Sequence, residues 1–324
     1  MPGFDDRWRD APDYVLGITR DIWEDRRIDS LLGYYGPDLV VRSPASVVVG
    51  NAGIIAATEA TLAEFPDREL LGEDVIWCPT GDDSFLSSHR LICTATHSGP
   101  GMYGAPTGRR LRYRILADCW CRANAVQDEW LVRDQGAIVR QMGQDLVEWT
   151  RDLIAREGGP EACVKPLTPA TDVAGPYDGR GNDSEYGQAL ADLLQRIMSG
   201  AFSAIAAGYD RAAELAYPGH VTGAGHADAD RFWLSLRSAF PSALFAVDHV
   251  IGMTDPLSPP RAAVRWSLTG RHDGWGAFGA PTGAEVYVMG ITHAEFGPRG
   301  LRREWTLIDE TAIWKQILLA TGAA

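Results

Sequence analysis

The sequence predicts an α+β protein built from two tandem cone-shaped barrels, and three observations lead to this prediction. The segment His97–Gly108 reads HSGPGMYGAPTG, and His272–Gly283 repeats it as HDGWGAFGAPTG with eight of twelve positions identical. Each half of the chain shows about three helical patterns followed by several strand patterns. The length of 324 residues exceeds one ordinary core and suits two domains of about 100 to 150 residues.

The repeat keeps a constant offset of 175 residues along the chain. The same offset carries Trp130 onto Trp305 and Asp134 onto Asp309. One offset without gaps indicates a duplicated globular domain rather than the short units of a solenoid or propeller. We therefore expect a first domain at residues 1–157, a linker at 158–184 and a second domain at 185–324.

The first domain is expected to begin with a helix, because Asp10 can cap it, Pro12 suits its first turn and apolar residues recur at helical spacing from Tyr14 to Trp23. The later elements follow from periodicity and turn residues. They are helices at 29–35 and 54–65, strands at 39–44, 46–50, 75–78, 87–97, 110–121 and 130–134, and a helical pattern over 135–156.

The second domain repeats this order. Its expected elements are helices at 186–202, 209–215 and 229–240, strands at 245–252, 262–272, 285–296 and 301–309, and a closing helix at 310–319. In both halves the strands predict a long, bent, mostly antiparallel sheet whose concave face is closed by helices. Such a cone has an apolar interior, which is a natural small-molecule site.

Composition excludes several classes of function. A net charge of −13 disfavours binding to nucleic acid, which requires clustered Lys and Arg. There is no apolar run of about 18 residues and no signal core at the start. The five cysteines lack zinc or thioredoxin spacing, which favours free thiols in a reducing compartment. We therefore expect a cytoplasmic protein that binds neither nucleic acid nor membrane.

Several segments carry a resemblance to a known family. Ala262–Gly274, Gly279–Gly283 and Glu304–Asp309 resemble the SnoaL-like polyketide cyclases, which have the cystatin-like cone of the nuclear transport factor 2-like superfamily. Ser88–Gly99 and Glu129–Asp134 carry the same signature in the first copy. The resemblance covers all but the linker and the extreme termini, and it is more specific for the fold than for the function.

The resemblance implies a catalytic carboxylate in each copy. In the cyclases that this sequence resembles, one acidic residue on a late strand is the general acid and base of an aldol ring closure, without cofactor or metal. The matching positions are Asp134 and Asp309. Because side chains alternate along a strand, Trp130 shares a face with Asp134, and Trp305 with Asp309. If the tryptophans face the cavity, burial should raise the pKa of both carboxyl groups toward the working pH.

An enolate also needs a hydrogen-bond donor or a cation beside it. The expected catalytic donors are His97, His272 and His293; Asp118 replaces His293 in the first copy, which removes that help there. The residues expected to contact the substrate are Trp130, Trp305, Arg90, Arg265, Tyr103, Phe278 and Trp120. No metal or cofactor is expected, since the histidines share no ligand spacing.

Structural roles remain open for the same residues. Each candidate aspartate directly precedes a helix and can act only as its N-cap. The two loop histidines can fix the Gly-rich loop, whose glycines and proline suit a turn rather than a phosphate site. Both arginines can point to the outer sheet face, where domains of this fold pair.

These observations favour a cofactor-free lyase or isomerase that acts on a hydrophobic carbonyl compound. The alternatives are a non-catalytic small-molecule binding protein and a dehydratase or epoxide hydrolase of the same fold. Epoxide hydrolysis is disfavoured, because the strands of Arg90 and Arg265 lack an Asp two positions away. We expect either a homodimer or an internal pseudo-dimer that buries the outer sheet faces.

Overall fold

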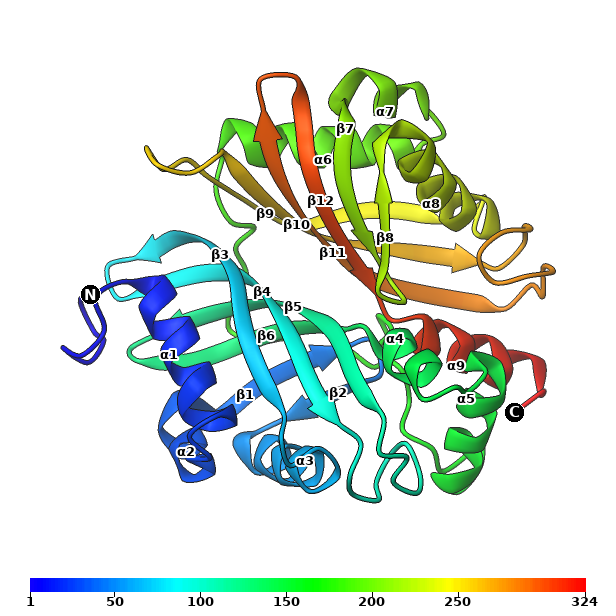
Figure 1. Cartoon of the computed structure of the whole chain (residues 1–324), viewed down its shortest axis with the longest axis horizontal. Coiled ribbons are helices and arrows are strands. Elements are labelled where there is room, and N and C mark those ends of the chain that lie inside the picture. The colour runs from blue at the N-terminus through cyan, green and yellow to red at the C-terminus, as the bar shows by residue number, and fades with distance from the viewer.

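The computed structural model describes residues 1–324, which form two domains of the same topology (Figure 1). Each domain has a six-stranded sheet, in the order β2-β1-β6-β5-β4-β3 and β8-β7-β12-β11-β10-β9. The pairs β1–β6 and β7–β12 are parallel, and the other neighbours are antiparallel. The tandem α+β fold is therefore confirmed.

The first domain starts as expected, with the Asp10 carboxylate accepting a hydrogen bond from Asp13 N at the start of α1. Its helices are α1 (Ala11–Trp23), the 3-10 turn η1 (Ile28–Ser30), α2 (Leu31–Tyr34), α3 (Asn51–Glu64), α4 (Gln135–Gln141) and α5 (Leu146–Arg156). Its strands are β1 (Tyr35–Ser43), β2 (Ser46–Val49), β3 (Glu69–Gly81), β4 (Ser84–Thr96), β5 (Arg110–Arg122) and β6 (Ala125–Arg133).

The second domain differs from the sequence prediction between residues 203 and 224, where α7 and β8 were not expected. The helix expected at 209–215 is wrong, because this segment is strand β7, held between β8 and β12 by backbone pairing that overrides its local pattern. The helices are α6 (Glu185–Met198), α7 (Ser203–Gly208), α8 (Gly225–Ala239) and α9 (Glu310–Thr321). The strands are β7 (Tyr209–Tyr217), β8 (Val221–Ala224), β9 (Leu244–Met253), β10 (Arg261–Arg271), β11 (Glu285–Gly297) and β12 (Gly300–Ile308).

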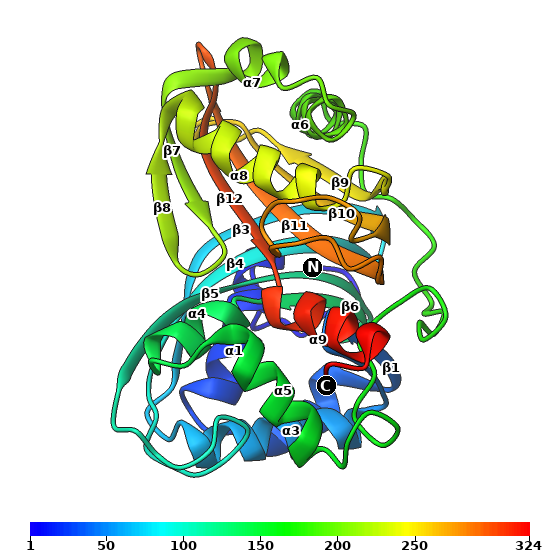
Figure 2. The same cartoon turned by 90° about the vertical axis from the view of Figure 1, so that its right-hand side faces the viewer.

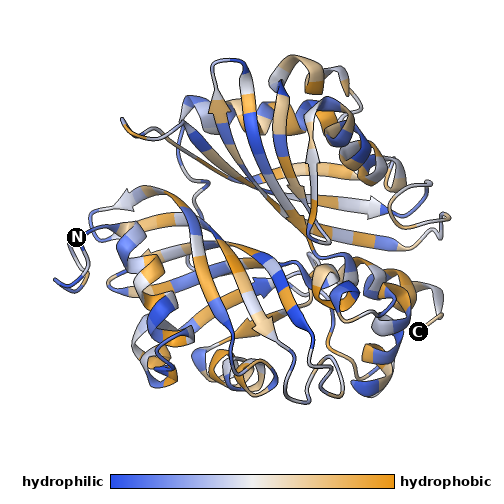
Figure 3. Cartoon of the chain, in the orientation of Figure 1, coloured by the Kyte–Doolittle hydropathy of each residue, from blue (hydrophilic) through white to orange (hydrophobic).

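The two sheets pack back to back, with most of the helices on their far sides (Figure 2). Side chains from both outer faces and Leu167 of the linker form one buried apolar cluster, whose other members are Leu116, Trp130, Val132, Met289, Ile291 and Leu307. Hydrophobic and hydrophilic positions alternate along these strands (Figure 3). Because the chain covers both outer sheet faces by itself, it is an internal pseudo-dimer.

Helix α9 links the domains a second time, since it leaves the second sheet and packs against α4 and α5 of the first domain. Glu310 pairs with Arg140, and Lys315 pairs with Glu157. Trp314 contacts the apolar cores of both domains. No helix of the chain combines the length and the apolar character that crossing a lipid bilayer requires.

The interiors of the two cones are filled differently. The second is one cluster of 33 buried apolar residues, in which Trp233 and Trp266 are fully buried. The first is divided into clusters of 16 and 15 residues, one against α1 and one against α4 and α5. Buried polar side chains lie along the first interior, and they define the candidate site described below.

Candidate functional site

Asp134 and Asp309 are helix N-caps. The Asp134 carboxylate accepts hydrogen bonds from Ala137 N in α4 and from Gly219 N and His220 N of the second domain, at 2.8–3.1 Å. Asp309 accepts from backbone N–H groups in the first turn of α9. Burial raises the pKa of each carboxyl to about 6. The prediction that these groups face a cone is nevertheless wrong, because their strand faces turn toward the other domain.

The expected substrate contacts Trp130, Trp305, Arg90 and Arg265 lie at that domain interface. The Arg90 guanidinium carbon is 3.6 Å from the Trp305 ring centre, and that of Arg265 is 4.8 Å from the Trp130 ring centre. Arg90 and Arg265 therefore point to the outer sheet face, which the sequence analysis gave as the alternative to a position inside the cone. Each tryptophan does share a strand face with its aspartate, as predicted. Because the two domains pack together, however, both faces of each sheet are buried. A buried tryptophan therefore does not identify the face that lines the cone.

His293 and Trp120 also belong to the interface. His293 Nε2 lies 2.8 Å from Ser88 Oγ of the other domain, and its Nδ1 lies 3.3 Å from Arg90 Nη1. Trp120 stacks on Tyr177 of the linker with ring centres 5.7 Å apart. Neither His293 nor Trp120 therefore faces the interior of a cone, where a substrate contact was expected.

The loop histidines hold the two repeated Gly-rich loops. The Nδ1 atoms of His97 and His272 lie 3.1 Å from Thr107 Oγ1 and Thr282 Oγ1, respectively. In the first copy, His97 Nε2 also lies 3.3 Å from the buried Glu64 carboxylate. Both rings are fully buried, so the structure supports loop fixation rather than the predicted catalytic contact.

This difference between the loops gives a testable prediction. His97→Ala is expected to lower the free energy of unfolding by about 1–3 kcal/mol, because the buried Glu64 carboxylate loses this partner and the loop loses its contact with Thr107. His272→Ala is the matched control and should have a smaller effect, since its loop lacks the carboxylate. Urea denaturation of both variants measures the difference, and equal losses would contradict this account.

Tyr103 and Phe278 occupy equivalent places in the two loops, but only Tyr103 carries a polar atom. Tyr103 stacks on Trp149 of α5 with ring centres 5.6 Å apart, and its buried hydroxyl has no hydrogen-bond partner in the chain. Phe278 packs between Phe240 and Trp314 in the apolar core. The two expected contacts thus face the interiors of their domains.

Besides Trp8, His97 and Trp149, the first-domain interior contains six side chains that each have a buried polar atom without a hydrogen-bond partner in the chain. A buried donor or acceptor left in this way costs about 1–3 kcal/mol, and native proteins keep few of them. We call these residues the inner polar set: Tyr14, Arg68, His89, Tyr103, Glu129 and Arg133. The sequence reasoning missed all but Tyr103.

Strand register places three of these side chains on the concave face of the first sheet. Glu129 and Arg133 are four residues apart on β6, so their side chains lie on the same face of the strand. They are the register partners of Cys119 and Ile115 on β5. Cys119 and Ile115 belong to the apolar interior clusters. His89 lies on the same face of β4, opposite Ala117.

Glu129 is the carboxyl group of this interior. It is 6% exposed, and burial raises its pKa to about 7, while the nearby Tyr35 hydroxyl favours the charged form. Burial also lowers the pKa of His89 to about 4. At neutral pH the interior therefore combines a half-ionised carboxyl with an uncharged imidazole, which suits proton transfer.

The second domain has the same glutamate in a closed network. Glu304, at the repeat offset from Glu129, accepts hydrogen bonds from Tyr209, Tyr217 and Thr306 hydroxyls at 2.6–3.0 Å. In place of Arg68, His89 and Arg133, the second copy has Ala243, Val264 and Ile308. These substitutions leave the second interior apolar around a satisfied carboxyl group.

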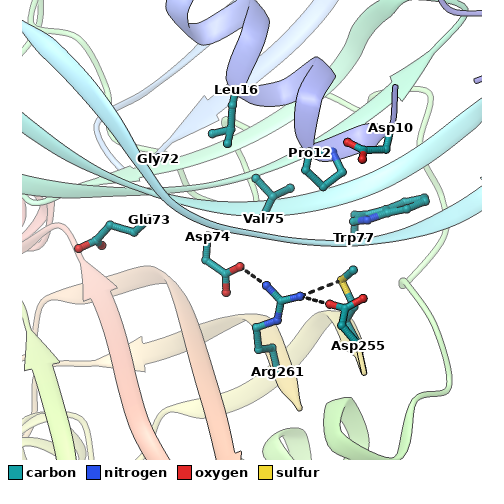
Figure 4. A pocket seen from close by; sticks show the side chains of 11 residues that line it. Asp10, Pro12, Leu16, Gly72, Glu73, Asp74, Val75, Trp77, Asp255 and Arg261 are labelled. Carbon is teal, nitrogen blue, oxygen red and sulfur yellow. Dashed lines mark hydrogen bonds and ion pairs between the residues drawn. The ribbon is translucent and has the colours of Figure 1, made fainter. Parts of the chain in front are cut away.

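A cleft of about 470 Å³ lies elsewhere, between α1 and β3 of the first domain and β9 and β10 of the second (Figure 4). Arg261 crosses it and pairs with Asp74 of the first domain and Asp255 of the second. This arrangement braces the domains. No set of three or more His, Cys, Asp or Glu side chains is placed to hold a metal ion, and the five cysteines are free and buried.

Comparison with known proteins gives one family match, within the first domain. Residues 14–142 match the family model of the SnoaL-like polyketide cyclases. Over these residues the first domain is similar to the SnoaL-like polyketide cyclases. The matched region ends at the C-cap of α4, and the second domain repeats the topology of the first. No curated protein matches the chain.

Solved structures of similar fold each correspond to one domain. IdmH, a candidate polyketide cyclase from Streptomyces antibioticus, is 23% identical, with a TM-score of 0.36, over 41% of this chain and 97% of its own. A SnoaL-like polyketide cyclase from Agrobacterium tumefaciens is 20% identical, with a TM-score of 0.33, over 41% of this chain and 97% of its own. AclR, a candidate hydroxylase from Streptomyces galilaeus, is 18% identical, with a TM-score of 0.36, over 43% and 82%.

Proposed function

We propose that the SnoaL-like first domain is a cofactor-free acid–base enzyme that acts on an apolar carbonyl compound, with Glu129 as its proton-transfer group. The observation that carries this proposal is the buried Glu129 carboxyl, whose Oε2 atom has no hydrogen-bond partner in the chain. Its equivalent Glu304 is fully engaged by three hydroxyl groups. The family match supports an aldol-type cyclase or a related lyase or isomerase.

The reaction that this interior suits begins with removal of a proton from the carbon beside a carbonyl. The Glu129 carboxylate takes the proton, the C–H electron pair moves into the carbonyl, and an enolate forms. The Tyr14 hydroxyl and the neutral His89 ring, both with free hydrogen-bonding capacity, are the available donors for the enolate oxygen. The enolate carbon then bonds to a second carbonyl carbon, and Glu129 returns its proton to the new alkoxide.

The second domain supports this site from outside. Its interior carboxyl, Glu304, is engaged by three hydroxyl groups, so it has no free carboxylate for acid–base work. Its outer sheet face covers that of the first domain, and α9 packs against α4 and α5, which close one end of the first cone. We therefore assign the chemistry to the first domain alone.

The test uses acetophenone as a simple ketone probe in heavy water. Proton abstraction by Glu129 should exchange the methyl protons for deuterium, which proton NMR follows directly. Glu129→Gln is expected to slow the catalysed exchange about 100- to 10,000-fold, the usual worth of a general base.

Three variants serve as controls. Glu304→Gln removes the equivalent carboxyl of the other domain and should leave the exchange unchanged, as should Asp134→Asn and Asp309→Asn. Loss of exchange in either aspartate variant, with Glu129→Gln still active, would overturn the assignment. Binding of the probe without any exchange would support a non-catalytic binding protein instead.

A further inference from the structure

Arg68 is a buried cation without a carboxylate partner. It lies in the turn between α3 and β3 and is 1% exposed. Its Nε donates a hydrogen bond to Cys93 Sγ at 3.3 Å, its guanidinium carbon lies 4.1 Å from the Trp23 ring centre, and Nη1 has no partner in the chain. The ionisable groups that act on it are the Tyr113 phenol and the Cys93 thiol, not a carboxylate.

Burial of a charge in this way is unfavourable unless another group compensates it. Burial raises the pKa of Tyr113 to about 12, so this phenol stays neutral at pH 7 and does not supply the missing negative charge. Arg68 thus has no carboxylate within ion-pair distance, and only the Trp23 ring, the Cys93 thiol and the neutral Tyr113 phenol stabilise its charge. Most other buried arginines of this protein, such as Arg42 and Arg90, pair with a carboxylate.

A second cation lies in the same part of the interior. Arg133 Nε is buried without a hydrogen-bond partner. The positive charge of Arg133 is close enough to Tyr103 and Tyr113 to oppose the rise in pKa that burial causes in both phenols. Cys93, Tyr103 and Tyr113 belong to the apolar cluster against α4 and α5. Two arginines thus converge on one apolar region, while the second domain has Ala243 and Ile308 at these places.

We propose that the first-domain interior binds an apolar organic acid as its anion, with Arg68 holding the negatively charged group and Arg133 assisting. The aromatic and aliphatic side chains around the two guanidinium groups contact the apolar body of the ligand. This inference rests on the proposed function only in placing the ligand in the first cone. It adds the charge of the substrate, which the acid–base chemistry of Glu129 does not define.

The experiment compares two fluorescent probes of similar shape on the full chain. Anilinonaphthalene sulfonate carries a negative charge, and phenylnaphthylamine is uncharged. Arg68→Met is expected to weaken binding of the sulfonate about tenfold or more, as loss of a charge-assisted hydrogen bond does, and to change binding of the neutral probe less than about twofold. Arg68→Lys keeps the charge and should restore most of the sulfonate affinity.

The control is Arg9→Met, which removes the same charge at a side chain that is 81% exposed and far from the interior. It should leave both affinities unchanged. If Arg68→Met weakens both probes equally, or neither, the charge assignment is wrong while a ligand site in the cone stands. If neither probe binds the unmodified chain, the interior admits no ligand of this kind, and the proposed function fails together with this inference.

Discussion

Stability of the unliganded chain is expected to fall by about 3 kcal/mol through Glu129 alone as the pH rises from 4.5 to 7. The folded chain raises the pKa of this carboxyl from 4.5 to about 7, chiefly through burial. A raised acid pKa means that the folded state holds the proton more tightly. The stabilisation is therefore complete below the unfolded pKa and is lost as the pH passes the folded pKa.

Urea denaturation of the unmodified chain and Glu129→Gln across this pH range measures the effect as a difference. Taking the difference matters, because Asp134 and Asp309, whose pKa values burial also raises, act in the same direction, while His89, whose pKa burial lowers, acts in the opposite one. Glu59→Gln, at an exposed position of α3, is the control. Identical pH profiles for the chain and Glu129→Gln would show that the carboxyl titrates normally.

Replacing Asp118 by alanine is expected to lower the free energy of unfolding by about 1–3 kcal/mol. Asp118 is 1% exposed at the centre of the domain interface. Its Oδ2 lies 2.9 Å from His249 Nδ1 and 4.0 Å from Arg265 Nε. Without it, the Arg265 guanidinium loses a nearby buried negative charge, and the imidazole loses its hydrogen-bond partner.

Chemical denaturation measured by tryptophan fluorescence checks this prediction, because Trp130 lies against His249 with ring centres 4.5 Å apart. Asp25→Ala breaks an exposed ion pair with Arg20 and should change stability by less than about 1 kcal/mol. A similar small loss for Asp118→Ala would mean that Asp248, which lies 3.3 Å from Arg265 Nη1, compensates the guanidinium charge by itself. Two separate unfolding transitions in Asp118→Ala would show that the domains come apart before they unfold, and that the substitution weakens the interface alone.

Much of the fold could be predicted because the sequence contains two copies of the same domain. The constant offset between His97 and His272 fixed the duplication, and strand periodicity placed most of the sheet. The segment that became β7 was misassigned, since its strand state depends on pairing with β12, far along the chain. Alternation also grouped Trp130 with Asp134 correctly, yet it could not say which face was the concave one.

The candidate site was harder to predict for a related reason. Glu129 and Glu304 match at the repeat offset, a signal that was available, but nothing local shows that one carboxyl is satisfied by Tyr209, Tyr217 and Thr306 while the other has a free oxygen. Arg68 follows Pro66 and Asp67 in a short turn, and turn residues of this kind usually lie at the surface. Its burial depends on Trp23, Cys93 and Tyr113, which the fold brings in from three other elements.

The sequence by itself determined the duplication, the α+β class and the resemblance to the SnoaL-like family, because these follow from repeated motifs and local periodicity. Tertiary structure alone decided that the outer sheet faces meet within one chain, that Asp134 and Asp309 are caps, and that the free polar groups gather in the first cone. The physical reason is that burial and hydrogen-bond satisfaction are set by packing between distant segments, and side-chain alternation is the same whichever face of a strand is covered.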